Sequence, residues 1–142
     1  MKKKSETHLY LEQVEMLDSI IKNKLIEKQQ WKDIALGITA NIDGERVQSS
    51  GVKDKMASAV EKCVDIEAEI DGLIDKLIDT KKEVIQTIES LDSPHEYKLL
   101  HLRYIQYIPL ETIADMWCVP YTNITTTHGR AVKHVQAIRN RK

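Results

Sequence analysis

Apolar residues recur at helical spacing along two long stretches of the chain. The first stretch runs from His8 to about residue 38, with Glu, Lys and Gln between the apolar positions Leu9, Val14, Leu17, Ile20, Ile21, Leu25, Ile34 and Ile38. The second runs from Lys53 to Leu91 as an a/d seam at Met56, Val60, Cys63, Ile66, Ile70, Leu73, Leu77, Val84, Ile88 and Leu91. Each stretch predicts one long helix.

The segment between these two helices, residues 41–51, has the chemistry of a turn. It contains Asp43-Gly44 and Ser49-Ser50-Gly51, in which glycine supplies positive φ and serine can cap the helix that follows. Helices this long cannot bury an apolar stripe alone, so they fold back as an antiparallel hairpin, pair with another chain, or do both. We expect the hairpin, because the connecting segment is short.

A new helix and a new domain are predicted from Ser93 onwards. Ser93-Pro94-His95-Glu96 is a capping box with proline at the first helical position. Helical stretches follow over 94–106, from Pro109 to Trp117, and from Tyr121 towards residue 140, and Cys118-Val119-Pro120 separates the last two. We expect one small core here, made by Ile113, Ala114, Trp117, Val119, Ile124, Ala131, Val132 and Val135.

The predicted fold is therefore all-α. A long, coiled-coil-like antiparallel helical hairpin over residues 1–92 precedes a three-helix domain with a helix-turn-helix over residues 93–142. The composition agrees with this: 30% of the 142 residues are charged and only five are glycine and three proline, which suits long solvated helices rather than a sandwich or barrel. No apolar run reaches the length of a membrane span and the start lacks a signal peptide, so we expect a soluble, cytoplasmic protein with no membrane partner.

The net charge of −1 is unevenly distributed. Residues 94–142 carry seven Lys or Arg and three acids, and no acid follows Asp115, so the last 27 residues carry +5. Residues 1–93 therefore carry −5. This asymmetry indicates an acidic body with a basic end that faces an anion, which modestly favours a nucleic-acid partner.

Enzyme and metal chemistry have little support in the sequence. Cys63 and Cys118 are 55 positions apart, so we expect two reduced thiols rather than a disulfide or a zinc site. Histidine pairs six residues apart do not share a helix face, and the carboxylates of the second long helix form a solvated face. No nucleophile–base pair, glycine-rich phosphate loop or HExxH motif occurs, and we expect no enzyme activity, cofactor or metal.

Residues 94–138 resemble region 4 of the bacterial sigma-70 factors. Leu110-Glu111-Thr112-Ile113-Ala114 resembles the start of that region's helix-turn-helix, residues 117–124 align without gaps on its turn and recognition helix, and 129–132 align on the basic half of that helix. Residues 99–105 match the helix before the motif. With its helical first part, the chain is similar to small phage- or prophage-encoded regulators of the autolysin-regulator (ArpU) and late-gene activator (RinA) types.

The resemblance implies double-stranded DNA as the partner, with a recognition helix over about 120–138 in the major groove. The positions that would read bases are Tyr121, Thr122, Thr125 and Thr126, and those that would contact phosphates are Asn123, Arg130 and Lys133. Threonine makes single hydrogen bonds or contacts the thymine methyl group, so base discrimination is expected to be weak or biased towards A·T-rich sites. Arg139, Arg141 and Lys142 are expected to form a frayed basic tail. The promoter-melting regions of a complete sigma factor are missing.

The leading hypothesis is a sequence-specific DNA-binding transcriptional regulator of phage or prophage type, working in the bacterial cytoplasm. The acidic hairpin would mediate homodimerisation or contact RNA polymerase or a phage protein. The alternative is a small-terminase-like DNA-packaging or assembly protein with the same helix-turn-helix and a coiled-coil hub. A third possibility is a protein–protein adaptor that has lost DNA binding.

Overall fold

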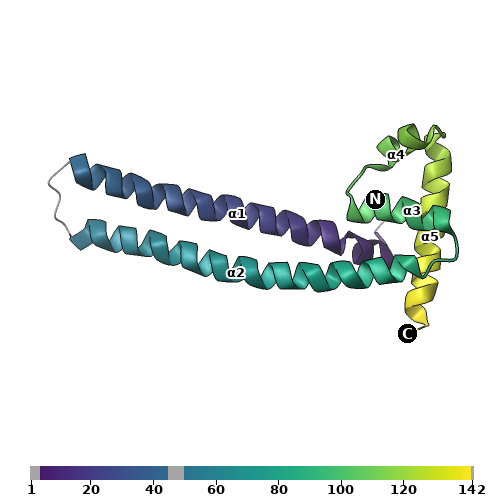
Figure 1. Cartoon of the computed structure of the whole chain (residues 1–142), viewed down its shortest axis with the longest axis horizontal. Helices are drawn as coiled ribbons and strands as arrows, with labels where there is room; N and C mark the ends of the chain where they lie inside the picture. The colour runs from purple at the N-terminus through teal and green to yellow at the C-terminus, as the bar shows by residue number, and fades with distance from the viewer. Residues whose placement is uncertain (1–3, 45–49, 142) are drawn as a thin grey trace. The chain divides into compact units, whose positions relative to one another are not determined.

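The computed structural model describes residues 4–44 and 50–141, and this part of the chain consists of helices joined by short turns, without strands. The elements are α1 (Glu6–Gly44), α2 (Ser50–Glu89), α3 (Pro94–Leu100), the π-helical segment η1 (His101–Ile105), α4 (Leu110–Trp117) and α5 (Tyr121–Asn140). Figure 1 labels the five α-helices. The all-α prediction is confirmed. The chain divides into two compact units: a hairpin unit, Asp18–Lys76, and a terminal unit made of Met1–Leu17 and Leu77–Lys142.

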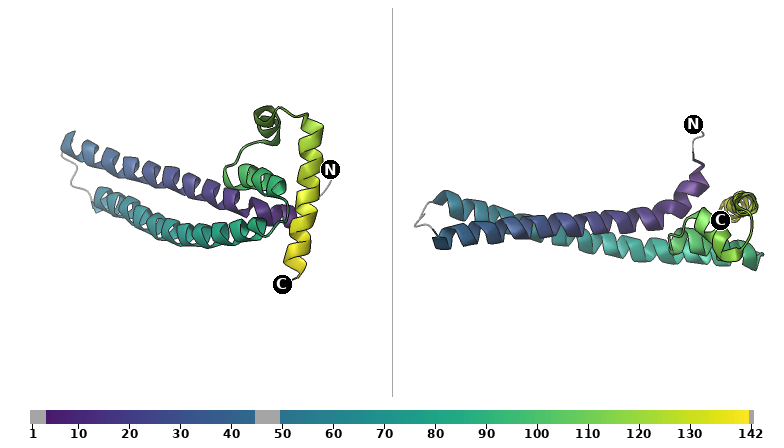
Figure 2. Two further views of the ribbon diagram at one scale, coloured as in Figure 1. Left: turned by 45° about the vertical axis from the view of Figure 1, so that its right-hand side comes forward. Right: turned by 90° about the horizontal axis from the view of Figure 1, so that it is seen from above.

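In the hairpin unit, the parts of α1 and α2 that belong to it run side by side in opposite directions (Figure 2). Two ion pairs join them, since Lys24 Nζ lies 2.7 Å from Glu69 Oε2 and Lys28 Nζ lies 2.7 Å from Glu67 Oε1. The antiparallel arrangement and these ion pairs confirm the long helical pair expected from the sequence.

The facing seam of the hairpin unit differs from the predicted one at several positions. On α2, Ala59 is buried and Val60, one position along, is 51% exposed. On α1, Leu25 and Ile34 are about half exposed, whereas the partly buried Lys24 and Lys28 occupy the positions that face α2. The a/d spacing continues through these lysines, and their ion pairs with α2 take the place of apolar contacts.

The helix boundaries also extend beyond the predicted ones. Residues 41–44 and 50–51, which the turn chemistry assigned to the loop, are helical. The rest of that predicted loop, residues 45–49, lies outside the described part of the chain.

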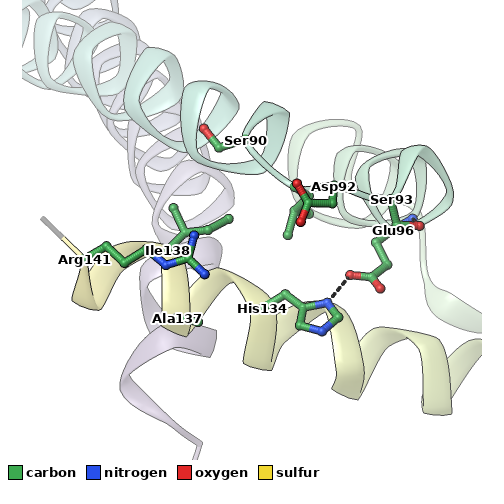
Figure 3. Close-up of a pocket in the computed structure, with 9 residues that line it drawn as sticks. Ser90, Asp92, Ser93, Glu96, His134, Ala137, Ile138 and Arg141 are labelled. Carbon is green, nitrogen blue, oxygen red and sulfur yellow. Dashed lines mark hydrogen bonds and ion pairs between the residues drawn. The ribbon is translucent and has the colours of Figure 1, made fainter.

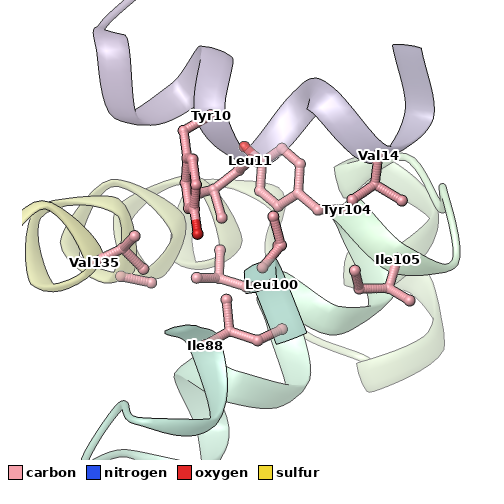
Figure 4. Packing of buried hydrophobic residues seen from close by; sticks show 10 residues of the cluster. Tyr10, Leu11, Val14, Ile88, Leu100, Tyr104, Ile105 and Val135 are labelled. Atoms are coloured by element: carbon pink, nitrogen blue, oxygen red, sulfur yellow. The ribbon is translucent and has the colours of Figure 1, made fainter. Parts of the chain in front are cut away.

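The terminal unit has a main core to which α1, α2, α3, η1 and α5 contribute (Figure 4). Tyr10, Leu11 and Val14 of α1 pack with Val84 and Ile88 of α2. The same cluster contains buried residues of the C-terminal segment: Leu100, Tyr104, Ile105, Ala131 and Val135. Inside it, Tyr10 Oη lies 2.9 Å from Thr87 Oγ1, which provides a partner for a buried hydroxyl.

A second, smaller core lies under α4 and the start of α5. Its buried members are Leu99, Ile113, Ala114 and Ile124, with Trp117 and Val119 packed against them. The sequence predicted one small core, and this was wrong: Ala131 and Val135 belong to the main core instead, together with Val132 at its edge. The reason is that the second half of α5 packs on the ends of α1 and α2 rather than on α4.

The predicted cap of α3 is present in part. Ser93 is the N-cap, Pro94 stands in the first turn, and the Glu96 backbone N–H donates to Ser93 Oγ at 3.3 Å. The Glu96 carboxylate pairs with a histidine of α5, as described below. After Leu100 the helix widens into the π-helical η1, which the apolar pattern did not predict.

Candidate nucleic-acid interface

Helices α4 and α5 are joined by a turn of three residues. Cys118 adopts the left-handed conformation, with φ 54° and ψ 44°, and ends α4. The Val119 N–H donates to the Ala114 carbonyl at 3.1 Å and the Cys118 N–H to the Asp115 carbonyl at 3.3 Å, the bonding pattern of a Schellman motif. Pro120 then caps α5 without a side-chain hydrogen bond. Buried Ala114 allows α4 and α5 to approach closely.

The face of α5 that points away from both cores carries most of the predicted DNA-contacting residues. The side chains classed as exposed are Tyr121, Thr122, Asn123, Thr126, Arg130 and Lys133, and Thr125 is half-buried. Ile124 separates them by pointing into the small core. Within the terminal unit, therefore, these seven positions are accessible or partly accessible rather than enclosed.

The threonine hydroxyls of this face already donate within the helix. Thr125 Oγ1 donates to the Thr122 carbonyl at 2.9 Å and Thr126 Oγ1 donates to the same carbonyl at 2.8 Å. Each hydroxyl proton is engaged, so each oxygen is left as an acceptor beside a methyl group. Such a pair can accept from an amino group or contact a methyl group, but it does not offer a second donor.

A hollow of about 290 Å³ lies along one side of this face. Its lining includes Asn123, Thr126 and Arg130 from the predicted set, Thr127 one position further along, and His95 at the start of α3. None of the described residues that line it is a carboxylate. Lys133 lies one turn beyond it on α5. An amide, a guanidinium and an imidazole around a cavity of this size suit an anionic group.

His95 is the residue of this site that the sequence analysis missed. Its ring centroid lies 4.9 Å from that of Trp117, which holds the imidazole at the edge of the hollow. The histidine stands 28 positions before Asn123, and the packing of α3 on α5 alone brings the two together. The position of His95 directly after Pro94 in the capping box was the only local signal, and it concerned helix capping.

The opposite side of α5 is fixed by a polar cluster. His128 Nε2 lies 2.6 Å from Tyr104 Oη, and His8 Nε2 of α1 lies 3.4 Å from the same oxygen. Burial, with smaller electrostatic contributions from His8 and Arg103, lowers the pKa of His128 to about 4. Burial also raises the pKa of the Tyr104 phenol. Both groups are therefore neutral near pH 7.

A second cavity, of about 150 Å³, lies where α2 and α3 meet the end of α5 (Figure 3). Buried Glu96 reaches across it, and its Oε1 lies 2.6 Å from His134 Nδ1 of α5. Ser90, Asp92 and Arg141 also line the cavity. The Glu96–His134 pair ties α3 to α5 and so helps to hold the α5 face in place.

The basic end of the chain is more ordered than the predicted tail. Arg139 lies within α5, and its guanidinium carbon is 3.9 Å from the centre of the Tyr10 ring. The prediction that Arg139 belongs to a frayed tail was wrong, because stacking on an aromatic ring of α1 holds it. Arg141 is exposed beyond the last helical residue, and Lys142 lies outside the described residues.

Cys63 and Cys118 are both free thiols, as predicted. Among residues 4–44 and 50–141, no three histidine, cysteine or carboxylate side chains are grouped so as to hold a metal ion. No helix in that part of the chain combines the length and the apolar character needed to cross a membrane. Comparison of the chain with protein-family models, curated proteins and solved structures gives no match.

Proposed function

We propose that this protein is a sequence-specific DNA-binding regulator of the phage or prophage type, acting in the cytoplasm of a bacterial host. In this proposal α4, the turn and α5 form a helix-turn-helix, and α5 is the recognition helix in the major groove. The resemblance of residues 94–138 to sigma-70 region 4 is the basis for the assignment. The protein has no catalytic role in the proposal and needs no cofactor.

The observation that carries the proposal is the exposed polar face of α5 beside a carboxylate-free hollow. Asn123 and Arg130 contribute to that hollow and Lys133 follows one turn later, so together they present donors and positive charge to a phosphate backbone. Tyr121, Thr122, Thr125 and Thr126 lie at the end of α5 that enters a groove first in this type of motif.

The bonding of the threonines favours a particular kind of target. With their protons donated to the Thr122 carbonyl, Thr125 and Thr126 can accept from the amino group of adenine and can place methyl groups against thymine. We therefore expect selection from a pool of random duplexes to enrich A·T-rich sites. Enrichment of guanine-containing sites would contradict this readout.

The salt dependence of DNA binding tests the proposal directly. The affinity of the full chain for the selected duplex should fall steeply with salt, because binding releases counterions from phosphates. Arg130→Ala should reduce the slope of log K against log salt by about one. The matched control is Lys82→Ala, which removes an exposed lysine of α2 and should leave the slope unchanged. A flat salt dependence of the unmodified protein would reject phosphate contact, and no shift of any duplex at low salt would favour the adaptor hypothesis.

The hairpin unit is proposed to mediate self-association, or contact with RNA polymerase or a phage protein. Several large apolar side chains of this unit are exposed, among them Leu25, Leu36, Val60 and Val64, as expected for a surface that meets a partner. A dimer would carry two helix-turn-helix motifs, and avidity would then compensate for weak base recognition by each of them. The same exposed side chains also fit the alternative, a small-terminase-like packaging protein. Light scattering separates the two, because a ring of many subunits supports the packaging protein and a monomer or dimer supports the regulator.

A further inference from the structure

One flank of the hairpin unit combines apolar side chains of both helices. On α1, Leu25 and Leu36 lie eleven residues apart, which places them on one face three turns apart. On α2, Val60, Val64 and Ile74 share one face, because Val64 is four residues and Ile74 fourteen residues after Val60. All five side chains are between 39% and 62% exposed.

An electrostatic contact places the α1 and α2 faces on the same flank of the hairpin. Lys32, between Leu25 and Leu36, and Glu67, between Val64 and Ile74, are close enough for the lysine to act on the carboxyl. The hydrogen bond and charge of Lys28, with a further contribution from Lys32, lower the pKa of Glu67. On α2, the other flank carries Lys62, Glu69 and Lys76 at the corresponding positions, so that side of α2 is charged.

We propose that this flank, formed by Leu25, Leu36, Val60, Val64 and Ile74, is where a second copy of the chain packs, so that two hairpin units form a four-helix bundle. The inference deepens the self-association part of the proposed function and does not depend on DNA binding. A two-fold axis places the same patch on both copies, so the patch must be complementary to itself.

The charges on the flank satisfy that requirement. The α1 face carries Lys22 and Lys32 and one carboxylate, Asp18, which lies 3.5 Å from Lys22, whereas the α2 face carries Glu67 and Asp71 and one lysine, Lys53. Packing α1 of one copy against α2 of the other brings lysines to carboxylates and apolar side chains to apolar side chains. A partner with one predominant charge would meet like charge on one of the two helices.

The size of the flank also suits a dimer. The two helical segments of the hairpin unit are each about 40 Å long, and two helices side by side are about 20 Å wide. The flank therefore offers roughly 800 Å² per copy, the usual size of a stable specific interface. The buried seam of the unit is small by comparison, with Ile21, Ala59, Ile66 and Ile70 as its buried apolar members.

The test is the oligomeric state of the full chain without DNA. Sedimentation equilibrium of the unmodified protein should fit a dimer. Val64→Asp should raise the dissociation constant at least 100-fold, because a carboxylate would be buried next to Glu67 and Asp71. The matched control is Ser58→Asp, at an exposed position of α2 about 160° around the helix from Val60, which should leave the dimer intact. Leu25→Asp tests the α1 half of the flank independently and should also dissociate the dimer.

Circular dichroism of each variant shows whether the helices persist, so loss of the dimer with full helicity supports the proposal. A monomeric unmodified protein, an assembly larger than a dimer, or a dimer that survives both Val64→Asp and Leu25→Asp would overturn it. A monomer that binds DNA would contradict the proposed dimer and support the DNA-binding proposal. A dimer that does not bind DNA would support the proposed dimer and contradict the DNA-binding proposal.

Discussion

At the scale of single residues, Cys118 adopts a backbone conformation that its Cβ disfavours. Its left-handed φ of 54° ends α4, and at this place in a helix terminus glycine is the usual residue. A Cβ in this conformation costs about 1 kcal/mol. Cys118→Gly should therefore stabilise the protein by about 1 kcal/mol, seen as a higher denaturant midpoint with an unchanged m value. Cys118→Ala keeps the Cβ and should give no such gain; an equal gain would mean that the thiol, and not the backbone, carries the cost.

His128 makes the terminal unit sensitive to acid. Its pKa in the folded protein is about 4, below the value of about 6.5 in an unfolded chain, because burial disfavours the charged ring. The unfolded chain therefore binds a proton that the folded protein does not, and stability falls as the pH decreases from about 6.5 towards 4, by about 3 kcal/mol at most. His128→Gln should flatten this part of the dependence of the unfolding free energy on pH, measured between pH 7 and pH 4.5. His95→Gln, which removes an exposed imidazole, should retain the full slope.

At the scale of elements, Gly129 lowers the stability of α5 relative to alanine. The glycine lies inside the helix on its exposed face, and a Cβ built there meets no atom within 4 Å. Alanine removes backbone freedom from the unfolded chain without a steric cost in the folded one, so Gly129→Ala should stabilise the protein by about 1 kcal/mol. Gly72→Ala, at an equally open position in α2, should give a similar gain in thermal unfolding. A loss of stability in Gly129→Ala alone would mean that α5 is not a regular helix at this residue.

The elements were more predictable from the sequence than the faces they bury. The starts of α3 and α5 follow from Ser93-Pro94 and from Pro120, because caps and proline act locally. The choice of Ala59 over Val60 at the seam of α2 depends on which side chains of α1 lie opposite. Likewise, Lys24 and Lys28 face α2 because Glu69 and Glu67 are there to pair with them. A hydrophobicity pattern does not contain that information.

At the scale of the whole molecule, the sequence predicted the residues of the candidate site but not what supports them. The exposed face of α5 follows from its helical period and from Ile124, which turns inwards. The structure adds His95 to the candidate site and assigns Ala131 and Val135 to the main core rather than to the small one. Both differences arise because segments far apart in the chain pack together in the terminal unit. Residues 93–142 share their main core with α1 and α2, so the compact unit includes Met1–Leu17 and Leu77–Lys142. The division at residue 92 as a boundary between functions stays a prediction.

Because of this shared core, the packing of α5 depends on the first turns of α1. Leu11 is fully buried in α1 and belongs to the same cluster as Ala131 and Val135 of α5. Leu11→Ala removes its methyl groups and leaves a cavity, so it should cost about 2–5 kcal/mol of unfolding free energy. Leu9→Ala, two positions away and 48% exposed in the native protein, should cost less than about 0.5 kcal/mol. If Leu11→Ala were as mild as Leu9→Ala in denaturant unfolding, α1 would not support α5, and residues 93–142 would be stable without it. Hydrogen exchange then locates the loss: in Leu11→Ala the backbone amides around Ala131 should exchange faster, although that residue is 120 positions away in the sequence.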